Sequence, residues 1–204
     1  MHPNPKFHWR DREAMAAFVA DIGFGTLIAQ CDGALRAVHV PVLVEAGRLR
    51  FHVARGNAIH AGLVAGCDAL FIVNGPDAYV SPDWYGMPDR VPTWNYVAVE
   101  LEGPVRALDR GALIGQLDDL SARQEARLAP KPAWTRAKMR EGRFEAMLGA
   151  ITAFEMEVAD WRGTIKLGQD KPEEARLRVA DALGGHEVAQ MMRATCSVPR
   201  GGKE

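Results

Sequence analysis

This 204-residue sequence has few cysteines and almost no excess of charge of one sign. Its three cysteines are Cys31, Cys67 and Cys196, and no two of them are spaced as in a zinc knuckle or a redox motif. Such scattered cysteines favour reduced thiols, so we expect a cytoplasmic protein without a metal site. The 25 basic and 26 acidic residues leave a net charge of -1. This balance gives no general attraction for nucleic acid or for a membrane surface.

Long apolar runs and nucleotide-binding motifs are also missing. No stretch approaches the roughly 18 apolar residues of a membrane span, and the N-terminus has no apolar signal region. There is no phosphate loop, Rossmann fingerprint, nucleophile elbow or internal repeat. What remains is a chain that is 48% apolar, enough for a sizeable core. We expect a single domain over residues 1–193, including a C-terminal helix, and a disordered tail over residues 194–204.

Alternating apolar residues predict several antiparallel strands, and helical spacing predicts peripheral helices. The predicted strands cover residues 23–30, 35–44, 49–54, 67–75, 96–108 and 150–167. The predicted helices cover residues 11–22, 57–66, 109–128, 135–148 and 172–184. This pattern indicates an α+β domain built on an antiparallel, barrel-like sheet with helices at its rim.

The central hairpin is predicted to turn at Ala46–Gly47. This turn pairs Val44 with Leu49, and the pairing then continues back along the strands to Pro41 beside His52 and His39 beside Ala54. His39, Arg50 and His52 then share one face, which either faces water or holds an anion or a polar cofactor edge.

The segment Arg55–Asn57 follows this hairpin and leads into a predicted helix. Arg55 offers a planar fork of donors, Gly56 allows close approach of the backbone, and Asn57 adds a polar cap. These features suit a phosphate cradle, but they also suit an ordinary capped strand-to-helix loop.

Tryptophan and tyrosine residues gather beside prolines in "GPDAYVSPDWY", residues 75–85, and "VPTWNY", residues 91–96. Proline fixes the backbone and removes a donor, so this stretch is predicted to be a rigid loop between two strands. Its rings Trp84, Tyr85, Trp94 and Tyr96 either cover a partner subunit or fold onto the core of their own chain.

Five segments in order, "HVPVLV", "FHVARGNAI", "GPDAYVSPDWY", "VPTWNYVAVELEG" and "IKLGQDKP", resemble the PaiB family of FMN-binding negative transcriptional regulators. The resemblance implies a six-stranded antiparallel split β-barrel, similar to pyridoxamine-phosphate oxidases. It also implies a homodimer with FMN at the subunit interface. One departure is "KLGQD", in which Gly168 and Asp170 replace the serine and asparagine that are common in the family.

The resemblance assigns flavin contacts to the strand and loop after the hairpin and to two later loops. The residues that it implies as cofactor-binding are His39, Val40, Pro41, His52, Val53, Ala54, Arg55, Asn57, Trp94, Asn95, Lys166 and Gln169. It identifies no catalytic residue.

Two functions follow from this resemblance. The chain is an FMN-binding PaiB-type protein that acts as a negative transcriptional regulator, or it is a flavin-dependent oxidoreductase whose substrate the sequence does not reveal. The most basic segment, residues 126–140, is the candidate for contact with DNA phosphates, although a charged run is usually a solvated face. A third interpretation is a split-barrel dimer whose flavin site has decayed.

Overall fold

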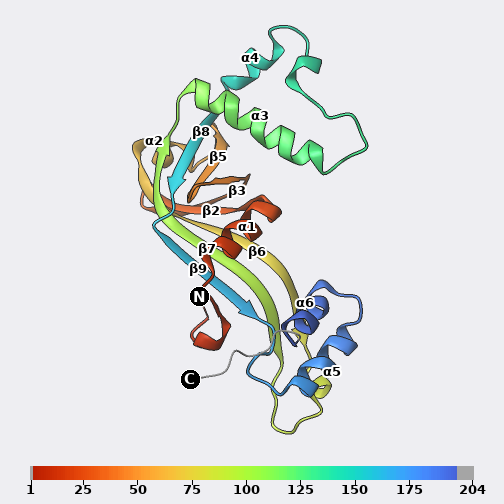
Figure 1. Ribbon diagram of the computed structural model, residues 1–204. Helices are drawn as coiled ribbons and strands as arrows, with labels where there is room; N and C mark the ends of the chain where they lie inside the picture. Colours follow the sequence, from red (N-terminus) through yellow and green to blue (C-terminus); the bar gives the residue numbers. More distant parts are fainter. Residues whose placement is uncertain (1, 197–204) are drawn as a thin grey trace. The chain divides into compact units, whose positions relative to one another are not determined.

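The computed structural model describes residues 2–196, which form two compact units. Unit 1 contains residues 2–11, 74–99 and 162–196, and unit 2 contains residues 12–73 and 100–161. The strands form one antiparallel sheet in the order β3-β2-β6-β7-β8-β5-β4, with β9 beside β7 and β1 beside β9 (Figure 1). The sheet has nine strands rather than the six expected, and two of the additions, β1 and β4, have only two and three residues. The single domain expected over residues 1–193 stays a prediction.

Unit 2 holds the hairpins and most helices. Its elements are α1 (Arg12–Ile22), β2 (Phe24–Cys31), β3 (Ala34–Pro41), β4 (Leu43–Glu45), β5 (Arg48–Ala54), α2 (His60–Ala65), α3 (Arg110–Ala126), the short 3₁₀ turn η3 (Arg136–Lys138), α4 (Arg143–Leu148) and β8 (Ile151–Glu157). Alternate residues of its strands face inward, so Phe51, Phe71 and Phe154 are completely buried. The rings of Phe51 and Phe154 stack with centroids 5.8 Å apart.

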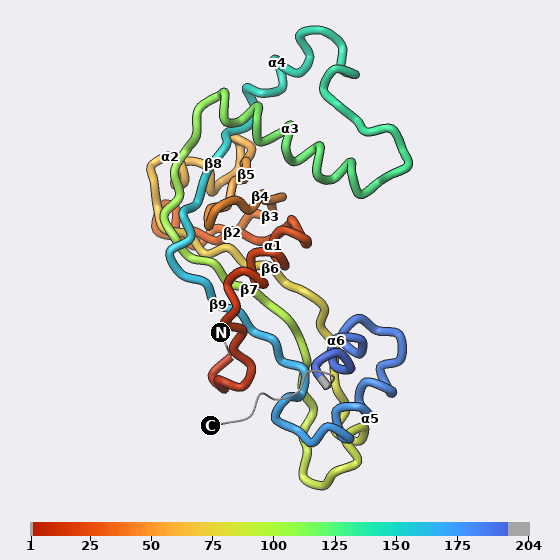
Figure 2. Tube along the Cα trace, viewed as in Figure 1, coloured from red at the N-terminus to blue at the C-terminus, as the bar shows by residue number. Residues whose placement is uncertain are grey.

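Unit 1 contains the chain's N-terminal segment and its last two helices. Its elements are η1 (Pro5–Phe7), β1 (His8–Trp9), η2 (Pro82–Tyr85), most of β9 (Asp160–Lys166), α5 (Glu173–Leu183) and α6 (Glu187–Cys196). The long strands β6 (Cys67–Val80) and β7 (Thr93–Ala107) contribute residues to both units (Figure 2). Buried side chains from α5 and α6 pack with Val80 and Tyr85 in the core of this unit.

The predicted hairpin is correct near its turn and wrong beyond it. Val44 pairs with Leu49 and Leu43 with Arg50, as expected. Further back, β3 is paired with β2 instead, in a continuous ladder from Cys31–Ala34 to Phe24–Pro41. The Asp32–Gly33 turn explains the difference, because both residues have positive φ and close a tight hairpin. The expected Pro41–His52 and His39–Ala54 pairs are therefore absent from the described ladders.

Two predicted helices are shorter than expected. The helix expected over residues 57–66 begins only at His60, because the side chain of Asn57 accepts a hydrogen bond from the Ile59 amide and holds a turn. The helix expected over 135–148 is replaced by η3 and α4. Of the expected tail, Ala194–Cys196 belong to α6, and residues 197–204 lie outside the described part of the chain. No helix within residues 2–196 is long and apolar enough to cross a membrane.

Candidate functional site

The candidate residues on β3 and β5 divide into exposed and buried positions. His39 is exposed, and its Nδ1 lies 2.9 Å from Oγ1 of Thr26 on the neighbouring strand. Val40 and Val53 are buried core residues, with 4% and 2% of their surface exposed. Only their backbone atoms can meet a ligand. Pro41 is half-buried and Ala54 is exposed, so the ends of the two strands are the accessible part of this group.

The polar face of β5 is covered by α3, which the sequence did not indicate. Arg50 donates hydrogen bonds to Glu45 at 2.7 Å and to Asp119 of α3 at 3.2 Å. His52 pairs with Ala153 of β8, and its Nδ1 is buried without a hydrogen-bond partner among the described residues. Burial lowers the pKa of His52 below its usual value, because the charged imidazolium loses its hydration. His52 is therefore a neutral, sheltered side chain at pH 7.

Gln116 of α3 adds a second unsatisfied group in the same unit. Its side chain is fully buried, and neither its Oε1 nor its Nε2 has a hydrogen-bond partner among the described residues. Gln116 stands one helical turn before Asp119, the residue that binds Arg50 on β5. A buried amide without partners loses its hydration and gains nothing in return. The pattern of apolar residues did not indicate that Gln116 is buried, because glutamine is common on exposed helix faces.

Arg55 lines a small cavity whose wall also contains Asp109 and Arg110. Its Nε donates to the carbonyl of Ile151 at 3.4 Å, and its two outer nitrogens have no partner among the described residues. The cavity has a volume of about 170 Å³, and Arg110 and Thr152 also line it. Thr152 stands opposite Val53 in the β5–β8 ladder, and Arg110 is the first residue of α3. Nothing in the sequence pattern indicated that these two residues lie beside the same cavity as Arg55.

Asn57 has a local role beside this cavity. Its Oδ1 accepts from the Ile59 amide at 3.1 Å, and its carbonyl accepts from the His60 amide at 3.0 Å. The acceptor side of its amide is thus used in the turn before α2. Asn57 fixes the shape of the loop that carries Arg55, as the interpretation of an ordinary capped loop expects.

A polar pocket in unit 1 contains two further candidate residues. The pocket has a volume of about 310 Å³, and Asn95 and Lys166 line it together with Thr93. Lys166 donates from Nζ to Oγ1 of Thr93 at 2.5 Å. Desolvation by burial lowers the pKa of Lys166, an effect that neighbouring Asp170 opposes. Arg90 and Asp89 also line the wall, together with Lys171, which is paired with Asp170.

Asn95 is the buried polar residue of this pocket, with only 1% of its surface exposed. Its Nδ2 lies 3.4 Å from Sδ of Met192, a weak acceptor. Its Oδ1 is buried without a partner among the described residues. The pocket is therefore lined by a residue with an unsatisfied hydrogen-bond acceptor, Asn95, and by the cationic Lys166.

Gln169 is engaged within its own loop. Its Nε2 donates to the Ile165 carbonyl at 2.7 Å, and its Oε1 accepts from the Leu167 amide at 2.7 Å. Gly168, which lies between Leu167 and Gln169, has a φ of 77°. This backbone conformation suits glycine and disfavours the serine of the family pattern. Both ends of the Gln169 side chain thus stabilise the loop that carries Lys166.

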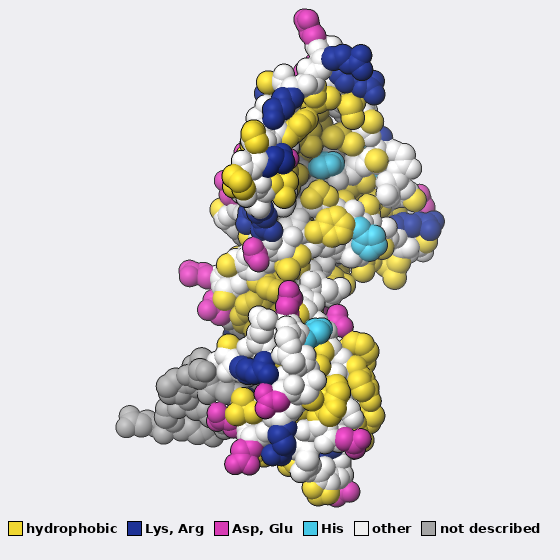
Figure 3. Space-filling model, turned by 90° about the vertical axis from the view of Figure 1, so that its right-hand side faces the viewer, with side chains coloured by type: hydrophobic (Ala, Val, Ile, Leu, Met, Phe, Trp, Pro, Cys, Tyr) yellow, Lys and Arg dark blue, Asp and Glu magenta, His cyan; other side chains and the backbone are white. Residues whose placement is uncertain are grey.

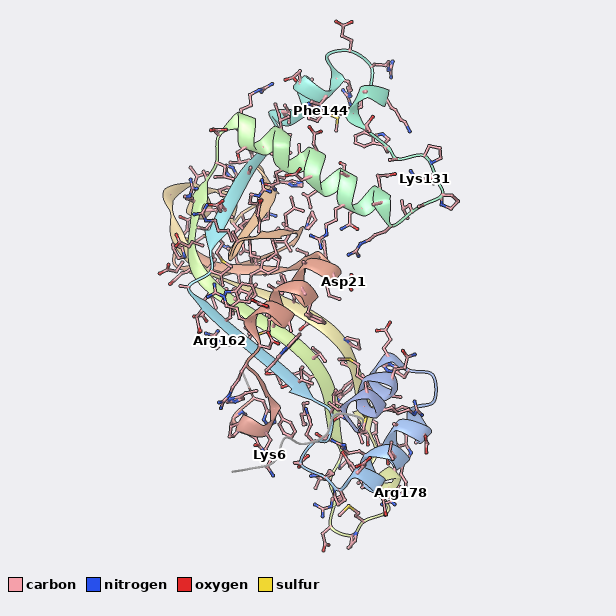
Figure 4. All side chains as sticks on the ribbon, viewed as in Figure 1. Lys6, Asp21, Lys131, Phe144, Arg162 and Arg178 are labelled. Atoms are coloured by element: carbon pink, nitrogen blue, oxygen red, sulfur yellow. The ribbon has the colours of Figure 1, made fainter. Side chains whose placement is uncertain are left out.

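The proline-flanked rings belong partly to the core of their own unit. Tyr85 has 2% of its surface exposed and packs with Val179 and neighbouring residues of α5, while Trp84 packs against the same cluster. Arg178 of α5 donates to the Tyr85 carbonyl at 3.0 Å (Figure 4). Of the two alternatives for the four rings, folding onto the core of its own chain therefore holds for Tyr85. Trp94 is different, because 54% of its surface is exposed and it meets only the edge of Tyr79 at 6.1 Å among the described rings.

The basic segment 126–140 is largely neutralised within unit 2. Arg127 binds Asp21 at 3.1 Å, and Lys131 binds Glu125. Arg136 binds Asp118 at 3.3 Å and lies over the ring of Phe144 of α4. Figure 4 shows Lys131 on the loop after α3, with Phe144 further along the chain. The face shown in Figure 3 carries basic and acidic side chains together, with no extended area of one sign.

Two sequence matches show the family of this chain. A family described as "Putative FMN-binding domain" matches residues 1–160. "Protease synthase and sporulation protein PAI 2" of Bacillus subtilis (strain 168) is 29% identical over 185 residues, which cover 89% of this chain and 88% of that protein.

Two solved structures share the fold. The FAD and heme binding protein from Mycobacterium smegmatis has a TM-score of 0.59 at 22% identity, over 87% of this chain and 80% of that one. A conserved hypothetical protein from Mycobacterium tuberculosis has a TM-score of 0.60 at 14% identity, over 84% and 94%. At these identities the likeness concerns the fold alone. The α+β split-barrel fold expected from the sequence is confirmed.

Proposed function

The chain belongs to the FMN-binding family whose pattern spans residues 1–160, as a PaiB-type protein, and on this premise we propose that Arg55 holds the FMN phosphate. One observation carries the proposal: the Arg55 fork is anchored through Nε and keeps two outer nitrogens without a partner among the described residues. A phosphate accepts two parallel hydrogen bonds from such a fork. Arg110 and Thr152 line the same cavity, where Arg110 is paired with Glu145 and the Thr152 hydroxyl lies 2.9 Å from Nε2 of His60.

We propose the unit 1 pocket as a second candidate, separate from the Arg55 cavity, for contact with the pyrimidine end of a flavin. The flavin ring carries one N–H donor between two carbonyl oxygens, and Oδ1 of Asn95 is a buried acceptor that lacks a donor. The carbonyl oxygens of the flavin favour a positive charge, which Lys166 supplies. The residues present therefore fit the group. A flavin bound here supplies electron and hydride transfer, and the side chains bind it and limit its contact with water.

The homodimer belongs to the same proposal. Trp94 and Tyr79 expose 54% and 45% of their surfaces, and exposed aromatic pairs of this kind are typical of contact surfaces. We propose that Trp94 packs against a second copy of the chain and beside the flavin. Replacing Trp94 with Glu should then give a smaller particle in sedimentation and release the flavin at the same time. A folded monomeric W94E protein with full flavin affinity would contradict this assignment.

Direct regulation through DNA has less support. Three of the cations in segment 126–140 are paired with acids of their own unit, so few remain for phosphate groups. A flavin-dependent redox activity fits the pockets better than DNA binding does. The free thiols at Cys31 and Cys67 suit a cytoplasmic location. A salt-dependent gel shift at a micromolar or lower concentration with promoter DNA would reverse this preference.

Binding of FMN and riboflavin to the Arg55→Ala variant tests the phosphate assignment. Loss of a charged hydrogen-bond donor costs about 1.5–3 kcal/mol, which should weaken FMN binding about 10- to 150-fold. Riboflavin lacks the phosphate, so its affinity should change little. Arg36→Ala, which removes an equal charge from an exposed position on β3, should leave both affinities unchanged. Equal losses for FMN and riboflavin in R55A would place the phosphate elsewhere.

A further inference from the structure

Two of the three cysteines lie at the adjoining ends of two paired strands of unit 2. The antiparallel ladder between β2 and β6 pairs Leu27 with Phe71 and Ala29 with Ala69. Continuing this register by two residues brings Cys31, the last residue of β2, opposite Cys67, the first residue of β6. Side chains directly opposite each other in an antiparallel pair lie on the same face. The two thiols therefore project from the sheet side by side.

This arrangement satisfies the geometric requirement for a disulfide. The Cα atoms of directly opposite residues are about 4.5–5.5 Å apart, and disulfides form at about 4.4–6.8 Å. Both thiols are free in the structure. Burial raises the pKa of the Cys67 thiol, and the neighbouring Cys31 adds to the rise.

The two thiols differ in access. Cys31 has 3% of its surface exposed, and its Sγ donates to the Ile59 carbonyl at 3.6 Å. Helix α2 covers it so closely that a Cβ atom at Gly62 would overlap Sγ and lie 3.0 Å from the Cβ of Cys31. Cys67 is only half-buried. An oxidant from solvent therefore meets Cys67 first, and Cys31 is the neighbouring thiol that can resolve the product.

We propose that Cys31 and Cys67 are a peroxide-sensitive thiol pair that closes to a reversible cross-strand disulfide. The Cys67 thiolate attacks one oxygen of hydrogen peroxide, the O–O bond breaks, and Cys67 becomes a sulfenic acid as hydroxide leaves and is protonated to water. The Cys31 sulfur then attacks the Cys67 sulfur, the S–O bond breaks, and a second water leaves with the Cys31 proton. Two thiols are thereby oxidised by two electrons, and one peroxide is reduced to two waters.

The disulfide would join the two ends of the segment that contains β3, β4, β5, α2 and the Arg55 loop. Cross-linking the ends of a long segment restricts the unfolded chain, so the oxidised protein should resist denaturant better than the reduced one. The effect is reversible, because a thiol reductant opens the bond again. This consequence does not depend on the flavin assignment.

Mass mapping of the full-length protein tests the proposal. Reduced protein is treated with hydrogen peroxide, blocked with N-ethylmaleimide and digested with trypsin, which places Cys31 in peptide 13–36 and Cys67 in peptide 56–90. We expect these two peptides to be linked, and dithiothreitol to separate them. The rate should rise between pH 7 and pH 9, because the raised pKa of Cys67 leaves little thiolate at neutral pH.

Single variants separate the two roles and remove the third cysteine. In Cys196→Ser the link should form unchanged, together with a higher urea midpoint for the oxidised protein. In Cys31→Ser the sulfenic acid of Cys67 should persist and react with dimedone, and peroxide should no longer shift the urea midpoint. Oxidation of Cys67 to sulfinic acid in the wild-type protein without any 13–36 to 56–90 link would overturn the proposal. Complete alkylation of both thiols after peroxide treatment would do the same.

Discussion

Gly103 lies against the backbone of Glu157, so closely that a Cβ atom at Gly103 would overlap the Glu157 carbonyl oxygen and lie 2.9 Å from its carbon. Replacement of Gly103 with Ala must push two backbone segments apart, because neither is a flexible side chain. We expect a loss of unfolding free energy of about 2 kcal/mol or more. Gly115 offers the matched control, since it lies within α3 with open space around it. Gly115→Ala should stabilise by about 0.5–1 kcal/mol, and urea denaturation of both variants measures the contrast.

We expect replacement of Gln116 with methionine to stabilise the folded protein. Its buried amide has no described partner, so replacing it with methionine of similar length should remove an uncompensated desolvation. We expect the apo protein to gain about 1 kcal/mol of unfolding free energy in urea titration. Gln124→Met on the exposed side of the same helix should change it by less than about 0.5 kcal/mol. A destabilised Q116M variant would show that a bound water or ligand satisfies the amide.

His52 predicts a loss of stability in mild acid. Its pKa in the folded protein lies below 6.5, so below pH 6.5 the unfolded chain binds the proton more readily than the folded one. The resulting destabilisation is absent above pH 6.5, grows as the pH falls towards the folded pKa, and is constant below it. His52→Gln should remove this contribution. The difference between wild type and H52Q in urea midpoint, measured from pH 7.5 to pH 5, should therefore decrease towards acid, and a constant difference would contradict the buried neutral histidine.

We expect replacement of Lys166 to raise the folding stability of the apo protein and to lower its affinity for FMN. Burial lowers its pKa in the folded protein, so the folded state gains stability relative to the unfolded state as the pH rises from that folded pKa towards 10.5. Lys166→Met should remove this alkaline gain and make the apo protein more stable at pH 7. The same variant should bind FMN more weakly, if the unit 1 pocket receives the flavin. Lys6→Met removes a charge from an exposed position and serves as the control for both measurements.

The sequence was most informative where a local rule decides the structure. The Ala46–Gly47 turn and its Val44–Leu49 pair followed from alternation and turn residues alone. Asp109 begins α3 as expected, because its Oδ1 accepts a hydrogen bond from the Ala112 amide. These contacts join residues that are close along the chain, and short-range patterns describe such contacts well.

The site required information that a single sequence does not carry. Nothing in the residue pattern brings Arg110 and Thr152 to Arg55, because the three lie on different elements. The covering of β5 by α3 is also a long-range contact, and it leaves His52 half-buried on a face that looked solvated. Competition between two possible partners for β3 was settled by the Asp32–Gly33 hairpin, which closes a shorter loop.

The closed loop around Gln169 has a consequence for how relatives of this protein are recognised. A glutamine that ties Ile165 and Leu167 together serves the shape of the loop, whatever the loop binds. Descendants that have lost their cofactor can therefore keep this glutamine. A motif scored on this position therefore reports the shape of the loop rather than its chemistry, and under the proposed function the Arg55 fork and the Asn95 amide are the groups whose loss would accompany loss of the flavin.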